Sequence, residues 1–301
     1  MSIKLGVHSG QQDCSYDELR KIWHLADTSG LYWVSVWDHF YEAPYRDGTG
    51  DCFEATATMA ALAAETRNVR VGCLVFCMGY RNPGVLAKSA ATIDHISGGR
   101  LELGIGGGWH EAEHQAFGIP FRPVKERLDI LEESVQIIRS LLTNEKTSFN
   151  GHYFKFEDAY CNPKPLQPSP RIWIGGRGEI RTLRIVAKYA DGWNAAYISA
   201  EDYQKKSEIL DQWCAREDRD PKSIQRNVNV HFQMGANEIS AQQKRKAFQG
   251  QEALYGTPAE VIEHIGEYAK AGAEGLNIAL RAPFDWEALQ AFMEEVVPHF
   301  K

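Results

Sequence analysis

Residues 32–37 read YWVSVW, a run with one small polar side chain that ends directly before Asp38 and His39. Strands that are buried on both faces form such near-continuous apolar runs, and they are typical of parallel sheets. The segment before the run has a helical pattern, in which Ser15 and Glu18 form a capping box at the start. The stretch therefore predicts a helix followed by a buried parallel strand.

The same alternation of helical segment and apolar run extends over the whole chain. Seven further runs have the composition of strands, at residues 4–9, 69–76, 100–106, 171–176, 192–197, 227–232 and 275–280. Eight strands, each followed by a helix, predict an α/β fold that closes into a (β/α)8 TIM barrel. We expect one domain over residues 1–301, and an open doubly wound sheet is the alternative.

Three segments depart from the alternation and are expected to be insertions, at about residues 107–123, 143–170 and 232–256. The second contains FNGHYFKF, which predicts a hairpin with Asn150 and Gly151 in the turn. The third is polar and longer than an ordinary loop, which favours a flap or a functional insertion.

Composition excludes several classes of protein. The chain has 301 residues and a formal net charge of −7, and its basic residues form no block that would indicate a nucleic-acid partner. The start, MSIKLGVHSG, has no apolar signal segment, and no run is long enough to cross a membrane. Six cysteines occur without a CxxC pair. We expect a cytoplasmic protein without a membrane or nucleic-acid partner.

Asp38 and His39 follow the second predicted strand. In a barrel of this type the carboxyl ends of the strands line the mouth of the active site. Histidine titrates near neutral pH, so it gives or takes a proton without a large environmental shift. The residues therefore indicate acid–base chemistry. The alternative is structural, with Asp38 capping a loop and His39 hydrogen-bonded in the core.

A glycine-rich stretch, GIGGGWHEAEH, follows the fourth predicted strand. Gly104, Gly106 and Gly107 resemble a dinucleotide fingerprint, but Trp109 stands where that pattern requires its last glycine. The glycines favour a backbone that approaches a flat ligand, with Trp109 stacking on it or walling it.

The letters HEAEH at residues 110–114 match the H-E-x-x-H zinc pattern. His110 and His114 would lie one helical turn apart, with Glu111 as a general base, as in a zinc hydrolase. No third ligand is obvious, and Pro120 limits the helix to little more than two turns. We expect no metal, and a zinc hydrolase remains a remote alternative.

A second glycine turn, IGGRGE, follows the fifth predicted strand. Gly175, Gly176 and Gly178 precede a helical segment, and Arg177 lies among them. Backbone N–H groups at a helix start bind phosphate, and a guanidinium adds a bidentate partner. The alternative is a plain strand-to-helix turn.

Three of these stretches, DHF at 38–40, residues 80–121 and residues 172–194, resemble the luciferase-like monooxygenase superfamily. The resemblance extends over nearly the whole chain, and its long middle stretch is specific for the superfamily. Within it, the chain resembles the branch of oxidoreductases that use the deazaflavin coenzyme F-420 (F420). The letters DHF favour F420 over FMN. An FMN-dependent monooxygenase of the same superfamily is the alternative.

The resemblance implies a TIM barrel with insertions, a cofactor at the carboxyl ends of the strands, a small organic substrate and a homodimer. It implies that His39 handles a proton beside the reactive ring, and that Asp38 contacts the cofactor or orients the site. In the segment formed by Cys73, Leu74 and Val75 it implies a non-proline cis peptide between Leu74 and Val75, behind the ring.

The same resemblance implies that Gly107 and Gly108 approach the cofactor, and that Gly175, Gly176 and Arg177 hold its phosphate. The chain departs from the pattern at one position. The sugar-phosphate dehydrogenases of this branch have a glutamate acid where this sequence has Trp109. Glu113 is the nearest carboxylate to take that role, unless it pairs with an arginine or lysine of the insertion.

Overall fold

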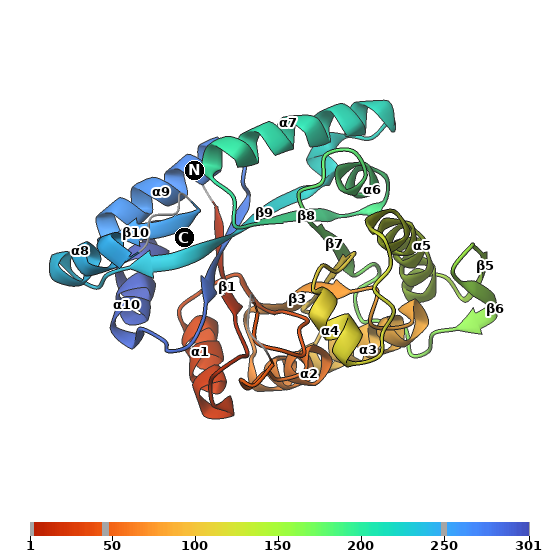
Figure 1. The fold of residues 1–301 in the computed structure, drawn as a ribbon, viewed down its shortest axis with the longest axis horizontal. Helices are drawn as coiled ribbons and strands as arrows, with labels where there is room; N and C mark the ends of the chain where they lie inside the picture. Colours follow the sequence, from red (N-terminus) through yellow and green to blue (C-terminus); the bar gives the residue numbers. More distant parts are fainter. Residues whose placement is uncertain (1–2, 44–47, 248–251, 301) are drawn as a thin grey trace.

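The computed structural model describes residues 3–43, 48–247 and 252–300. Its main sheet is parallel, in the order β10-β9-β11-β1-β2-β3-β4-β7-β8, and β8 also pairs with β9. This last pairing closes eight strands into a barrel, which Figure 1 shows end-on with helices around it. The predicted (β/α)8 fold is confirmed, and the open sheet is excluded.

The eight barrel strands match the eight predicted runs. They are β1 (Lys4–Ser9), β2 (Trp33–Val36), β3 (Arg70–Cys77), β4 (Leu101–Gly106), β7 (Arg171–Gly175), β8 (Gly192–Ala196), β9 (Gln225–Met234) and β11 (Gly275–Leu280). The helices of the outer ring are α1 (Tyr16–Thr28), α2 (Ala55–Glu65), α3 (Pro83–Ser97), α5 (Val124–Thr143), α6 (Thr182–Tyr189), α7 (Ala200–Arg216), α9 (Pro258–Lys270) and α10 (Trp286–Ala291). The chain from Phe292 to Phe300 continues as a π turn and a 3-10 turn.

Local signals set the helix ends. Ser15 caps α1 because its hydroxyl oxygen accepts the backbone N–H of Glu18. The carboxylate of Glu18 in turn accepts the backbone N–H of Ser15. Thr257 and Glu260 form the same capping box at α9. Each box satisfies backbone donors that the first helical turn leaves free. No helix in the described part of the chain is long and apolar enough to cross a membrane.

The second insertion is a hairpin, as predicted, made of β5 (Lys146–Asn150) and β6 (Lys155–Tyr160). Asn150 ends the strand, so the predicted turn is placed one residue early, and the N–H of Gly151 donates to the carbonyl of Phe154 at 2.9 Å. The carboxylate of Glu133 on α5 accepts three consecutive backbone N–H groups of this turn. The hairpin is therefore anchored to the outside of α5 (Figure 1).

Residues 232–256, expected to be a flap or a functional insertion, form regular secondary structure in the part that the structure describes. The segment contains the end of β9, helix α8 (Glu238–Ala247) and strand β10 (Ala253–Gly256), and residues 248–251 lie outside the described ranges. β10 pairs in parallel with the end of β9, where Leu254 is fully buried. The polar composition belongs to the outer face of α8, which Figure 1 shows at the edge of the molecule.

Glycines inside the barrel make room for one side chain, that of Val75. A Cβ on Gly106 would lie 2.6 Å from Val75 Cγ2, and one on Gly175 would lie 2.8 Å from its Cγ1. Gly104 meets the same side chain at 3.1 Å. The pairing of β3 with β4 also shifts register between Cys73 and Phe76, the bulge that turns Val75 toward these glycines.

Gly106→Ala is therefore expected to destabilise the protein by about 1–3 kcal/mol, the usual range for overpacking a core. The clash is with a side chain, so most of the loss should be recovered in a Val75→Ala background. Gly266→Ala is the matched control, because its Cβ would meet nothing within 4 Å. Urea unfolding of these variants and of Val75→Ala gives the loss of stability caused by Gly106→Ala in each background. An equal loss in both backgrounds would contradict this packing.

Candidate active site

A pair of side chains, His39 and Glu113, lies at the carboxyl end of the barrel strands. His39 follows β2, and Glu113 comes from α4 (Glu111–Ala116), the short helix of the first insertion. The carboxylate Oε2 lies 2.9 Å from His39 Nδ1. His39 Nε2 makes no hydrogen bond within the described ranges. The pair therefore leaves one ring nitrogen available to a ligand.

Glu113 collects four hydrogen-bond donors although its side chain is fully buried. Besides His39, Tyr80 donates its hydroxyl to Oε2 at 2.6 Å. The backbone N–H groups of Phe40 and Tyr41 donate to Oε1 at 2.7 and 2.9 Å. The carboxylate therefore fixes both the ring of His39 and the backbone that follows it.

These contacts decide the charge of Glu113. Burial alone would raise the pKa of its carboxyl, but the hydrogen bonds from His39, Tyr80 and the Tyr41 N–H outweigh burial and lower the pKa to about 2. A carboxyl with this pKa is an anion near neutral pH and holds no proton that it could donate. The structure pairs Glu113 with His39 and not with an arginine or lysine of the insertion, and the role of Glu113 in place of the missing acid stays a prediction.

Asp38 is buried, and its carboxylate is occupied by neighbouring residues. Its two carboxylate oxygens accept from both Nη atoms of Arg81, and the backbone N–H of Cys77 donates to Oδ2 at 2.7 Å. This network ties the end of β2 to the end of β3. Of the two predicted roles, the geometry matches orientation of the site.

Aromatic rings border His39 on two sides. Trp109 is 54% exposed, and its ring centroid lies 5.3 Å from that of His39 in an edge arrangement. Trp37 is buried, with its centroid 6.5 Å from His39. The exposed Trp109 therefore lies beside His39, and its predicted contact with a flat ligand stays a prediction.

The segment that was expected behind the ring has the cis peptide between Leu74 and Val75. Val75 is half-buried, whereas Cys73 is fully buried. Burial raises the pKa of the Cys73 thiol well above its usual value. The side chain of Cys73 therefore offers no surface to a ligand, and only its backbone remains a candidate contact.

The glycines after β4 are also constrained by packing, and their predicted approach to a flat ligand stays a prediction. Gly108 has φ +72, and a Cβ there would lie 2.4 Å from Cys77 Sγ. A Cβ on Gly107 would meet Leu128 Cδ2 at 3.3 Å. Both glycines are half-buried.

The second glycine turn, residues 175–178, lies at the carboxyl end of β7. Gly176 has φ +133, and its N–H donates to the carbonyl of Asn194 at 3.1 Å, so it has no donor left for a phosphate. The N–H groups of Arg177 and Gly178 are exposed and make no hydrogen bond to a described residue. Arg177 Nη1 donates to the carbonyl of Tyr197 at 2.8 Å. Helix α6 begins at Thr182, four residues after Gly178.

The zinc alternative fails on geometry. Within the described residues, no group of three or more His, Cys, Asp or Glu side chains is arranged to hold a metal ion. Glu111 is exposed and bonded to Gln115, so it does not face His110 and His114. The HEAEH letters instead supply Glu113 to His39.

A model of the family described as "Luciferase-like monooxygenase" matches residues 1–253. The chain belongs to the luciferase-like monooxygenase family. Its members are oxidoreductases, and the resemblance that the motifs indicated is confirmed.

Relatives of this luciferase-like protein include F420-dependent enzymes. It is 27% identical to an F420-dependent glucose-6-phosphate dehydrogenase of Amycolatopsis mediterranei (strain U-32), with 99% of each chain covered. The fold matches an F420-dependent secondary alcohol dehydrogenase in complex with an F420-acetone adduct (TM-score 0.86, 18% identity, 100% of both chains). It also matches a monooxygenase from Streptomyces bottropensis (TM-score 0.84, 22% identity, 99% of this chain and 100% of the other).

Sequence reasoning missed several polar residues of the luciferase-like site. Arg81, which holds Asp38, lies in the connection after β3, and Arg281 and Tyr197 directly follow β11 and β8. All three follow the carboxyl end of a barrel strand. His39 was found because it follows the carboxyl end of a strand. The same search after every strand would have found these three residues.

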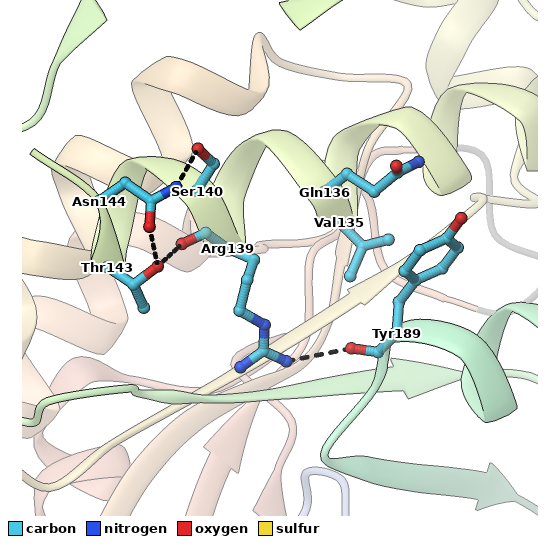
Figure 2. A pocket seen from close by; sticks show the side chains of 7 residues that line it. All are labelled: Val135, Gln136, Arg139, Ser140, Thr143, Asn144 and Tyr189. Carbon is cyan, nitrogen blue, oxygen red and sulfur yellow. Dashed lines mark hydrogen bonds between the residues drawn. The ribbon is translucent and has the colours of Figure 1, made fainter. Parts of the chain in front are cut away.

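A separate groove of about 280 Å³ lies between α5 and Tyr189, the last residue of α6 (Figure 2). Figure 2 shows that Arg139 in this groove donates to the carbonyl of Tyr189, and Arg139 also pairs with Asp191. Asp191 precedes β8, so the groove is at the amino ends of the strands. Its charged group is already neutralised, and it is not part of the candidate site.

Proposed function

We propose that this protein is an F420-dependent oxidoreductase that passes a hydride between the deazaflavin and a small organic substrate. His39 is proposed to move the accompanying proton at Nε2. The observation that carries the proposal is the Nδ1 contact with Glu113, because it holds the ring in one orientation. The F420-dependent relatives support the choice of cofactor.

The residues at the carboxyl end fit such a cofactor. The exposed N–H groups of Arg177 and Gly178 lie beside a guanidinium, which is a suitable donor set for the cofactor's phosphate. Val75 of β3 is apolar and half-buried, and it is the side chain of this segment that could contact the ring. When bound, the deazaflavin would supply the hydride chemistry.

The chain's own residues would handle the proton and exclude water. The bound deazaflavin would accept or supply the hydride. His39 Nε2 would accept the O–H proton of the substrate in alcohol oxidation and would donate it to the oxygen in carbonyl reduction. The Glu113 anion stabilises the positive charge that His39 gains, and Trp109 shields the reacting groups from solvent.

The substrate is proposed to be an alcohol, carbonyl, enone or imine of modest size rather than glucose 6-phosphate. The relative from Amycolatopsis is named for that sugar phosphate, but the resemblance implies a glutamate acid where this chain has Trp109. An indole cannot donate a proton as a carboxyl does. His39 is then the available acid beside the ring.

Cofactor binding tests the proposal directly. We expect the purified apoprotein to bind F420 at least about tenfold more tightly than FMN, a difference of ~1.4 kcal/mol, as followed by tryptophan fluorescence. Arg177→Met should weaken F420 binding, because it removes a charged partner of the phosphate. Arg216→Met, on the outer helix α7, is the charge control. Preference for FMN would instead assign the protein to the monooxygenases and make oxygen uptake the next assay.

A further inference from the structure

A second polar cluster lies at the mouth of the barrel, on the other side of Trp37 from His39. It consists of Arg281, Tyr197, His231 and His8, and we call it the Arg281 cluster. Arg281 and Tyr197 follow β11 and β8, and His8 and His231 lie on β1 and β9. The strand register places both histidines beside Ala279 of β11.

The guanidinium of Arg281 contacts two aromatic rings. Its Cζ lies 5.4 Å from the ring centroid of Trp37 and 5.8 Å from that of Tyr197. Its Nη2 reaches the Tyr197 hydroxyl at 3.5 Å, the limit for a hydrogen bond, and its Nε is buried without a partner. Most of its five N–H donors are therefore unused by the described residues.

The charge of Arg281 is also not neutralised by these neighbours. Burial, then Arg281 and His39, lower the pKa of His8 to about 3, so His8 is neutral. Burial and Arg281 also lower the pKa of His231, against a weaker opposite effect of Glu252. No carboxylate of the described residues forms an ion pair with Arg281.

The other arginines near the barrel interior differ in this respect. Arg81 is paired with Asp38, and Arg70 and Arg171 are both paired with Glu102. An arginine that is shielded from solvent is ordinarily paired, because an uncompensated charge there is costly. Arg281 has no such carboxylate among the described residues, and unlike Arg100 and Arg127 it has no backbone carbonyl partner there either. Its guanidinium lies against Trp37, beside the site in which the substrate is proposed to bind.

The backbone beside Arg281 is held in an uncommon conformation. Tyr197 has φ +54, in the left-handed region that non-glycine residues rarely adopt. Its N–H donates to the carbonyl of Asn229 at 2.8 Å, and its own carbonyl accepts from Arg177. These bonds hold the Tyr197 ring against His231, with centroids 4.2 Å apart. Such local strain is concentrated at functional positions.

We propose that Arg281 binds an anionic oxygen, such as a carboxylate, on the substrate. The substrate class is then a small hydroxy or oxo acid, with its reacting carbon near His39 and its carboxylate at Arg281. Trp37 lies between the two groups and would contact the apolar part of the molecule. This inference deepens the proposed function and rests on it for the identity of the reaction.

Benzoate and its neutral isostere benzamide test the anion site by calorimetric titration of the F420-loaded protein. Wild type should prefer benzoate by about tenfold to hundredfold, the range for a charge-assisted pair. Arg281→Met should abolish that preference and leave benzamide unchanged, whereas Arg281→Lys should keep part of it. Lys205→Met, on the outside of α7, is the control for net charge and should change neither ligand.

The outcomes separate the sources of the anion. Absence of a benzoate preference in wild type overturns the proposal without recourse to any variant. The proposal is also overturned if Arg281→Met weakens F420 binding and leaves the preference for benzoate unchanged, because the arginine then binds the cofactor. If the apoprotein fails to bind F420 but still prefers benzoate through Arg281, the anion site stands and the proposed redox function fails.

Discussion

His39→Ala is expected to lower turnover by about 10²–10⁴-fold, the usual contribution of a positioned acid or base. The loss should be in kcat, since the ring handles a proton in the reaction and contributes little to cofactor affinity. Steady-state kinetics and a parallel F420 titration separate the two. Added imidazole should restore part of the rate, because a small base can occupy the space that the side chain leaves.

An exposed histidine provides the control for this experiment. His24 lies on the outer face of α1, so His24→Ala should retain wild-type turnover. If His39→Ala keeps its rate, or if the whole loss is explained by weaker F420 binding, then His39 does not move the proton and another acid must be sought at the mouth.

Glu113→Gln is expected to lower the free energy of unfolding by about 3 kcal/mol at neutral pH. The pKa of Glu113 is depressed from 4.5 to about 2, so the anion stabilises the fold fully above pH 4.5. That contribution is lost as pH falls from 4.5 through about 2. Urea unfolding should therefore show a gap between wild type and variant that narrows with acidification in this window.

Glu111→Gln is the matched control, because it removes a carboxylate from the same short helix. Glu111 is exposed and bonded only to Gln115, so its loss should change stability by less than about 0.5 kcal/mol. A Glu113→Gln variant that behaves like Glu111→Gln at every pH would contradict the four-donor site. Glu113→Gln should also reduce kcat, since the amide cannot stabilise a charged His39 ring.

The strand pattern was a reliable guide to the fold because it depends on short-range properties. Each apolar run is buried on both faces by helices whose own ends are set by local caps, such as that of Ser15. Residues 232–256 were expected to be a flap or a functional insertion because β10 is only four residues long and α8 is largely polar outside. The burial of β10 depends on its pairing with β9, which sequence spacing does not show.

The glycines illustrate a signal that was found and partly misinterpreted. Gly106 and Gly175 lie on different strands, and both make room for Val75 from a third strand. A requirement for glycine can be inferred from the sequence, but the group that needs the space belongs to a distant segment. The sequence therefore suggested a ligand as the reason for the glycines, whereas packing around Val75 is also a reason.

By itself, the sequence determined the eight strands, the helices between them and the position of His39 at the end of the second strand. The tertiary structure alone decided which groups meet there. His39 and Glu113 are 74 positions apart, and Glu113 reaches the ring only because α4 folds back over the barrel mouth. Periodicity and caps act over a few residues, whereas a charge and its partner are brought together by closure of the whole barrel.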